Sequence, residues 1–547
     1  MSPSALRLIS LLFRSRTCIF IFTCIFSTAP LDAQFDTTVV PHRYIVVYRN
    51  TIIPGDAEAR THAAGARLLH RNERFGMAII ATPASSPSSS TADDAEIMQR
   101  LAAQPNVDYV LHDRTVAASH FTLRPQIDPS FTVVLGPVKV HPIGPVFGHD
   151  PENPLTPIAP DPDTYYNSPQ GWAVSQVGGY GNNIPGGPAH GPWDTTTGKG
   201  VRIAILDSGI DATHPDLAPN LALNITEVNQ DPQTGLPSPC DDGSPQDQTG
   251  HGTWTASLAA AAQGAGTGET IGVAPSATLL NIKVLQRMPD TALGGVGSSS
   301  PSVQCTSGQA TGLLSWLLQG IEDAMANRAD IISMSLGTTV DLTTGEGAGL
   351  KAAFDRVTYA ASQAGIILIA AAGNDGYDLT NPRYIELPAQ ARDVLAIVAS
   401  TNPDCAQNPT AGAICAPGPI TLAYYSNFGA PLNALAAPGG SYPAGSDTGV
   451  TGWIRGACST GKPATTEGLP TDSTHSYGCF NLGHTPYVQA MGTSASTPLA
   501  AGVAALLRAA HPEWNAATVL AAMRSSAVPT PGLPVPQINA AAALNIH

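Results

Sequence analysis

The sequence predicts an α/β protein with a doubly wound, mostly parallel sheet, preceded by a small α+β unit and a targeting segment. From about residue 200 onward, apolar runs of strand length alternate with helical stretches. A second, shorter set of strands and helices occupies residues 44–113, and the chain opens with basic residues before an apolar run. Continuous apolar strands that alternate with helices are typical of a parallel sheet covered on both faces.

Residues 1–33 are predicted to be a secretory signal peptide. Arg7, Arg14 and Arg16 precede the apolar stretch 18–26, and small residues follow as far as Ala33. The apolar stretch is shorter than the roughly 20 residues that span a bilayer, so a membrane anchor is the less favoured alternative. We therefore expect a secreted protein, extracellular or periplasmic, with no stable membrane anchor after signal cleavage.

The composition fits a large, exported, globular protein. The chain has 547 residues, of which 43% are hydrophobic, and its net charge is -15, which argues against nucleic acid as a partner. Six cysteines follow the signal, an even number that indicates disulfides in an exported protein. Neighbouring positions suggest the pairs Cys405–Cys415, Cys458–Cys479 and Cys240–Cys305, although other pairings stay open.

Residues 34–118 are predicted to form an independent unit with the element order βαββαβ, the ferredoxin-like plan. The expected strands and helices are 44–48, 57–66, 67–70, 77–81, 94–103 and 107–111. Residues 119–170, rich in proline and glycine, are interpreted as a linker and processing region.

Residues 171–547 are predicted to form the main domain. Its strands are expected at Val201–Leu206, Thr278–Val284, Ile331–Leu336, Ile366–Ala371 and Val394–Ala399. Helices are expected at Thr253–Ala262, Thr311–Arg328 and Gly349–Ala364. Open α/β sheets bind ligands at the carboxyl ends of their strands, so reactive side chains are sought there.

Four polar residues stand at positions of this kind. Asp207 ends the first strand, His251 lies between two glycines at the start of a helix, and Asn374 follows a buried strand. Ser494 begins an apolar helix, and Ser496 is the likelier structural serine of the two. Each residue has a plain structural alternative, such as a turn, a helix cap or a packed histidine. A serine nucleophile needs a base, an orienting group and oxyanion donors, and these residues could supply them together.

The stretches around Asp207, His251, Asn374 and Ser494 resemble the four signatures of the subtilisin-like serine peptidases, in the same chain order. The resemblance covers about residues 193–545. Further landmarks that match are His214–Leu217, Leu387–Ala389, Ser426–Gly429 and Ala437–Gly439. Residues 34–118 resemble the inhibitory propeptide of the family.

The resemblance implies a subtilisin-like fold and a secreted serine endopeptidase made as a self-processed zymogen. Ser494 would attack the scissile carbonyl, His251 would transfer the proton, and Asp207 would orient the imidazole. The side chain of Asn374 and the backbone N–H of Ser494 would bind the oxyanion. The partners would be protein or peptide substrates and the protein's own propeptide, acting as an intramolecular inhibitor.

The resemblance also implies the substrate-binding residues. The stretch Ser335, Leu336 and Gly337 matches the strand that pairs with substrate backbone, and Ala371, Ala372 and Gly373 match the floor beside the first specificity pocket. The chemistry would require no cofactor. Structural calcium is expected from the family, although no contiguous ligand loop of the EF-hand type occurs, so metal ligands are not assigned.

Other interpretations stay open. The stretch Gly-Thr-Ser-Ala-Ser also resembles the acid-acting sedolisins, but His251 and Asn374 argue against that reading. A catalytically silent peptide-binding protein of the same fold and a peptide ligase that uses the same acyl-enzyme are the further alternatives. Asp375 and Asp378 could favour basic side chains before the scissile bond, or could be solvated loop acids. Trp254 stands where the family usually has a second histidine.

Overall fold

The computed structural model describes residues 39–83, 91–118, 166, 171–181, 190–228, 238–264, 267–289, 310–402, 420–441, 453–459 and 486–545. The predicted signal peptide, most of the predicted linker and four of the six cysteines lie outside the described residues. Within the described part, no helix is both long and apolar enough to cross a membrane.

The N-terminal unit has the predicted order of elements. These are β1 (Val39–Tyr48), α1 (Ala57–Ala63), β2 (Arg67–Asn72), β3 (Met77–Ala81), α2 (Thr91–Ala102) and β4 (Val107–Ala118), with the short 3-10 helix η2 (Arg49–Thr51) after β1. The strands pair antiparallel in the order β4-β1-β3-β2. Alternate side chains of β1, such as Tyr44 and Val46, pack with Leu101 of α2 in a small core of their own.

The main sheet is parallel except at one edge. Its strands run in the order β15-β14-β12-β10-β5-β7-β6, with β16 also paired to β14, and only β15 is antiparallel to its neighbour among these pairs. Their bounds are β5 (Arg202–Asp207), β6 (Leu221–Thr226), β7 (Thr278–Lys283), β10 (Ile331–Met334), β12 (Ile367–Ala371), β14 (Val394–Thr401), β15 (Thr421–Leu422) and β16 (Ala434–Pro438).

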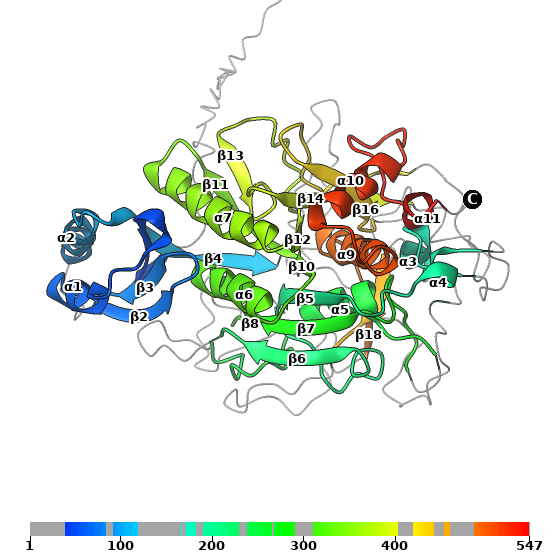
Figure 1. The fold of residues 1–547 in the computed structure, drawn as a ribbon, viewed down its shortest axis with the longest axis horizontal. Coiled ribbons are helices and arrows are strands. Elements are labelled where there is room, and N and C mark those ends of the chain that lie inside the picture. Colours follow the sequence, from blue (N-terminus) through cyan, green and yellow to red (C-terminus); the bar gives the residue numbers. More distant parts are fainter. Residues whose placement is uncertain are drawn as a thin grey trace, which may run out of the picture. The chain divides into compact units, whose positions relative to one another are not determined.

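Helices cover both faces of this sheet, as predicted for a doubly wound fold (Figure 1). In β5, Ile203 and Ile205 face a core that includes α5 (His251–Ala260) and α9 (Thr493–Ala510), whereas Ala204 and Leu206 face a core that includes α6 (Leu314–Ala326) and α7 (Gly345–Gln363). This alternation is the period-two pattern of a strand that is buried on both sides. Within the described ranges, the further helices are α3 (Trp172–Gln176), α4 (Pro192–Thr195), α10 (Ala516–Ser526) and α11 (Ala540–Ala543).

A second sheet joins the N-terminal unit to the main domain. The strand β4 runs between α6 and α7 (Figure 1) and pairs antiparallel with β9 (Ala310–Leu313) on one edge and β11 (Leu336–Asp341) on the other. The other strands in the described part of the main domain are β8 (Leu285–Arg287), which pairs with β9, and β13 (Tyr384–Leu387), which pairs with β11. The strands β17 (Ile454–Ala457) and β18 (Tyr487–Ala490) form a separate antiparallel pair.

Two sequence predictions are wrong at this junction. Residues 311–313, predicted as the start of a helix, are part of β9 because β4 and β8 supply strand partners on both sides. The strand predicted over residues 331–336 ends at Met334, because the chain leaves the main sheet after Ser335 and begins β11 in the second sheet. In both places long-range pairing decides the conformation.

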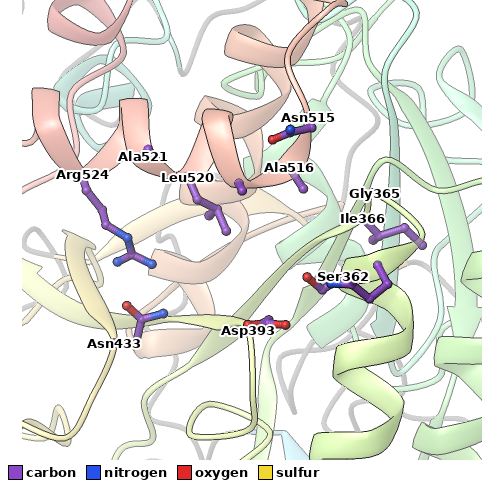
Figure 2. A pocket seen from close by; sticks show the side chains of 12 residues that line it. Ser362, Gly365, Ile366, Asp393, Asn433, Asn515, Ala516, Leu520, Ala521 and Arg524 are labelled. Carbon is purple, nitrogen blue, oxygen red and sulfur yellow. The ribbon is translucent and has the colours of Figure 1, made fainter.

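A cavity of about 520 Å³ lies at the opposite edge of the sheet from the predicted site. Figure 2 shows side chains of α10, including Arg524, facing it together with Ile366, which directly precedes β12. Asn374, in contrast, follows the carboxyl end of β12. This cavity is therefore distinct from the candidate active site.

Candidate active site

Asp207 and His251 form a buried hydrogen-bonded pair. Asp207 is the last residue of β5 and His251 is the first residue of α5, and the distance from Oδ1 to Nδ1 is 2.7 Å. The carboxylate also accepts bonds from the backbone N–H of Ser208 at 2.7 Å and from the hydroxyl of Thr255 at 3.1 Å. Because a carboxylate only accepts, Nδ1 of His251 must carry the proton, which leaves Nε2 as the basic nitrogen.

The loop before α5 is held by a second buried carboxylate, Asp247. Its Oδ1 accepts from the backbone N–H groups of Thr249 and Gly250 at 2.9 and 2.8 Å, and its Oδ2 accepts from the N–H and hydroxyl of Thr253 at 2.9 and 2.6 Å. Four charge-assisted bonds fix the start of the helix that carries His251. The sequence reasoning missed Asp247, whose only local signal is its position shortly before a glycine-flanked histidine.

The glycine after His251 is required by a close approach of two backbone segments. A Cβ on Gly252 would overlap the carbonyl oxygen of Gly209, which follows β5. The N–H of Gly252 donates to the hydroxyl of Ser208 at 2.9 Å. These contacts dock the first turn of α5 against the end of β5, which is the arrangement that the flanking glycines predicted.

Trp254, one turn into α5, packs behind His251. The two rings meet edge to face with centroids 6.0 Å apart, and the indole N–H donates to the carbonyl of Ile454 at 3.2 Å. A Cβ on Gly456 would lie 2.5 Å from Cδ1 of Trp254, so β17 passes tightly over the indole. Trp254, a buried aromatic side chain, thus occupies the position where subtilisin-like peptidases usually have a second histidine.

Ser494 is the second residue of α9 and is buried at the carboxyl edge of the main sheet. Its hydroxyl donates to the carbonyl of Ser335 over a long 3.4 Å, and the hydroxyl of Ser335 donates back to the carbonyl of Ser494 at 2.9 Å. Packing of α5 against α9 brings the helix that carries His251 alongside the helix that carries Ser494. In this structure the Ser494 hydroxyl bonds Ser335 and not His251.

Asn374 and the N–H of Ser494 converge on one point. Oδ1 of Asn374 accepts from the N–H and the hydroxyl of Thr493 at 2.9 and 2.7 Å, which orients the amide with Nδ2 on the other side. The position that a Cβ on Gly492 would take lies 3.2 Å from Nδ2 of Asn374 and 3.6 Å from the nitrogen of Ser494. Both nitrogens therefore lie near a common point, as an oxyanion site with two donors requires. Gly492, with φ 152°, keeps that point free.

The predicted substrate-binding strand is occupied by the protein's own chain. In the ladder between β11 and β4, Leu336 lies opposite Ala118 and Gly337 lies opposite Ala117. On the other edge of β4, Ala117 lies opposite Thr311 of β9, which the sequence reasoning did not include in the site. An extended segment is therefore held from both sides, and Ala118 lies opposite Leu336, the residue that follows Ser335.

The predicted pocket floor lies at the carboxyl end of β12 and includes its last residue, Ala371. Ala371, Ala372 and Gly373 are buried beside Asn374, and Gly373 has a positive φ of 99°. A Cβ on Gly373 would overlap the side-chain nitrogen of Asn427, whose oxygen accepts from the N–H of Asp375 at 3.1 Å. These contacts fix the turn at Gly373, and with it the position of Asn374 relative to the predicted pocket floor.

Two of the six cysteines that follow the predicted signal peptide, Cys240 and Cys458, lie within the described residues. Cys240 and Cys458 are both disulfide-bonded. The residues predicted to pair with them, Cys305 and Cys479, and the predicted pair Cys405–Cys415 lie outside the described residues, so the pairings stay predictions. Within the described ranges, no group of three or more acidic, histidine or cysteine side chains is arranged to hold a metal ion. Structural calcium stays an expectation without an assigned site.

Comparison with known proteins identifies the class. The model of the subtilase family matches residues 198–542, and the chain therefore belongs to this family of serine endopeptidases. The fold is accordingly subtilisin-like.

The chain is similar to subtilisin NAT of Bacillus subtilis subsp. natto, with 29% identity over 332 residues that cover 60% of this chain and 61% of the relative. It is also similar to an intracellular serine protease of Paenibacillus polymyxa, with 35% identity over 204 residues that cover 36% and 49%. The chain thus matches less than two thirds of the length of these relatives.

Among solved structures, the fold resembles that of the epidermin leader peptide processing serine protease from Staphylococcus aureus. The TM-score is 0.58 with 16% sequence identity, over 92% of this chain and 98% of that one. At this identity the likeness concerns the fold alone.

Proposed function

We propose that this chain is a secreted serine endopeptidase that hydrolyses peptide bonds through an acyl-enzyme. One observation carries the proposal: a buried Asp207–His251 pair and two converging donors, Asn374 and the N–H of Ser494, stand at the carboxyl edge of one sheet. The predicted segment 1–33 supports secretion.

In the proposed mechanism, Ser494 Oγ attacks the scissile carbonyl while Nε2 of His251 takes its proton. For this step the Ser494 hydroxyl would leave its 3.4 Å bond to Ser335 and donate to the imidazole instead. Asp207, bound to Nδ1 at 2.7 Å, stabilises the imidazolium that forms. Asn374 and the N–H of Ser494 bind the oxyanion, His251 returns the proton to the leaving amine, and water then attacks the acyl-enzyme by the same route.

We further propose that residues 34–118 are an inhibitory propeptide that the enzyme removes from itself. The ladder of β4 with β11 ends at Ala118 opposite Leu336, directly beside Ser335. Since Ser335 bonds Ser494 in both directions, the first scissile bond is proposed to lie within a few residues after Ala118, at the start of the predicted segment 119–170. The covalent connection makes this first cleavage intramolecular, which favours it strongly.

Buried polar contacts at the first turn of α6 would keep the propeptide bound after cleavage. Asp113 of β4 accepts from the N–H and hydroxyl of Ser315 in α6, at 3.1 and 2.5 Å. The guanidinium of Arg43 completes this cluster, 2.8 Å from Asp113. A carboxylate at a helix N-terminus is also favoured by the helix dipole.

The first turn of α7 makes a matching contact through Glu346. Its carboxylate accepts from the N–H and Nδ1 of His112 at 3.1 and 2.9 Å and lies 3.3 Å from the guanidinium of Arg114. Burial raises the pKa of Glu346, but the bond from His112 and the charge of Arg114 outweigh burial and lower that pKa to about 2. The carboxylate is therefore ionised over the working pH range, and it holds β4 between the two helices.

The test is labelling and activity of the purified protein, with the wild type measured after processing and Ser494→Ala measured as the uncut chain. A sulfonyl fluoride should add to Ser494, seen by mass spectrometry of the labelled peptide, and should abolish cleavage of casein. Ser494→Ala should take no label. Labelling elsewhere, or casein cleavage that survives Ser494→Ala, would contradict the proposal. Activity at acid pH that survives His251→Ala would favour the sedolisin-like alternative, and a folded chain with no label and no cleavage would favour the silent binder.

A further inference from the structure

A buried carboxyl, Glu386, lies between the two glycines of the proposed substrate-binding site. Glu386 belongs to β13 and is opposite Thr339 in the ladder with β11. A Cβ on Gly337 would overlap its Oε1, and a Cβ on Gly373 would come within 3.4 Å of its Cδ. One glycine belongs to the substrate-pairing strand and the other to the pocket floor. The carboxyl group therefore stands where the two walls of the first specificity pocket meet.

The carboxyl group is only partly satisfied by the protein. Oε2 accepts a hydrogen bond from the hydroxyl of Thr339 at 2.8 Å. Among the described residues, no donor bonds Oε1 and no cationic side chain forms an ion pair with Glu386. A buried carboxylate without a cation is costly, so a buried acid between these two glycines suggests that a bound ligand supplies the positive charge.

The electrostatic environment of Glu386 also favours a cationic ligand. Burial, together with the negative charge of Asp375, raises the pKa of Glu386 well above the usual range for a glutamate. Asp375 follows Asn374 directly and is half-buried. The two carboxyl groups create a site that is unfavourable for an anion and favourable for a cation, because a cation relieves both the desolvation of Glu386 and its repulsion by Asp375.

We propose that Glu386 selects substrates with arginine or lysine immediately before the scissile bond, by receiving the cationic end of that side chain at its carboxyl group. This inference rests on the proposed peptidase function and names its substrate class. The guanidinium of arginine suits the site best, because its fork of donors matches a carboxylate.

Of the two acids considered from the sequence, Asp378 is not part of this arrangement. It is exposed and accepts bonds from the N–H and the hydroxyl of Thr380 within its own turn. Replacing it removes a negative charge from the neighbourhood but not from the pocket. Asp378→Asn is therefore the matched control for long-range electrostatics.

The competing explanation is that the Glu386 side chain merely fills the pocket. In that case only a small residue would fit before the scissile bond, and Ala117 and Ala118 at the end of β4 are small. The two explanations differ in what the isosteric substitution Glu386→Gln does. It leaves the volume of the side chain nearly unchanged and removes its charge, so it alters selectivity only if charge selects the substrate.

The experiment uses processed wild type, Glu386→Gln and Asp378→Asn. Each is assayed with peptide p-nitroanilides that differ only in the residue before the scissile bond, which is arginine, lysine, leucine or alanine. The wild type should prefer arginine. Glu386→Gln should lower the ratio of kcat/KM for arginine over leucine by about tenfold or more, since a hydrogen bond to a charged group typically contributes at least that factor. Asp378→Asn should keep the wild-type ratio.

Two outcomes would overturn the inference about Glu386, and a third would overturn the proposed peptidase function. A wild type that prefers alanine, with the same preference in Glu386→Gln, shows a filled pocket and overturns the inference while the peptidase function stands. A wild type that cleaves leucine and alanine peptides but not arginine peptides also overturns it. A folded wild type that cleaves none of the peptides removes the proposed function itself.

A second measurement needs no variant, in case Glu386→Gln does not fold. Peptide aldehydes that end in argininal or in leucinal, and are otherwise identical, are compared as inhibitors of the wild type. The inference expects argininal to bind at least about tenfold more tightly, for the same charge-assisted bond. Equal inhibition by the two aldehydes, or tighter inhibition by leucinal, would overturn it.

Discussion

Replacing Asp113 with alanine should weaken the inhibitory hold of the N-terminal unit on the proposed enzyme. Asp113 and Arg43 form an ion pair at 2.8 Å with side chains that are 0% and 4% exposed. The same carboxylate accepts two bonds from Ser315, at 3.1 and 2.5 Å, and these two bonds cross to α6. Asp113→Ala removes the two bonds that Ser315 donates and leaves the buried Arg43 cation with the Ser315 hydroxyl, at 3.3 Å, but without its carboxylate for as long as the unit stays docked.

The size of the effect follows from these contacts. Breaking a buried ion pair by removing one partner costs about 3–5 kcal/mol. When the cleaved unit dissociates, Ser315 and much of Arg43 return to water, so most of that cost should appear as weaker association. A loss of about 3 kcal/mol corresponds to a dissociation constant raised about 150-fold.

The assay is the progress curve of peptide cleavage after self-processing, measured at several dilutions of the cleaved complex. Wild type should show a slow rise as the unit leaves, and Asp113→Ala should be active at concentrations where wild type is still inhibited. Asp56→Ala is the matched control, because Asp56 is an exposed acid of the same unit that pairs with Arg60 at 2.8 Å, within its own unit. Similar inhibition constants for all three proteins would refute the reasoning.

Three further predictions follow from single contacts. Thr493→Val removes the 2.7 Å bond that orients Asn374, and we expect kcat to fall up to about tenfold with KM nearly unchanged; a change confined to KM would contradict this. The pKa of Glu346 is lowered to about 2, so the uncut chain should lose stability as the pH falls from about 4.5 towards 2. In acid-unfolding curves, Glu346→Gln should make the free energy of unfolding less dependent on pH over this range. An unchanged pH dependence in the variant would contradict this role of Glu346. Gly456→Ala places a Cβ 2.5 Å from Trp254 and should lower the free energy of unfolding by about 1–3 kcal/mol, seen as a lower Tm. An unaltered Tm would show that β17 can shift away from Trp254 without cost.

The sequence alone could identify the residues whose roles follow from their immediate neighbours in the chain. Asp207 and Asn374 each follow an apolar run, and His251 is flanked by glycines. Ser494 begins an apolar helix. Strand ends and helix starts are marked by short-range patterns, and the fold then brings such ends to one edge. Alternating apolar strands and helices likewise predicted the doubly wound sheet.

What the sequence could not reveal depends on contacts between distant segments. Asp247 and Thr493 act through hydrogen bonds to loops whose positions only the fold defines. The strand β9 begins in a stretch with helical composition, and β4 and β8 make it extended. Glu386 lies in a short strand with no motif of its own, and its place between Gly337 and Gly373 follows from the pairing of β11 with β13.

The central claim is tested most directly by expressing residues 34–547 as wild type and as Ser494→Ala, and by following the N-terminal sequence and chain length over time. The account predicts that wild type acquires a new N-terminus within a few residues after Ala118, whereas Ser494→Ala folds and stays at full length. If both chains shorten alike, or if both fold and neither shortens, the proposal of a self-processing serine peptidase is contradicted.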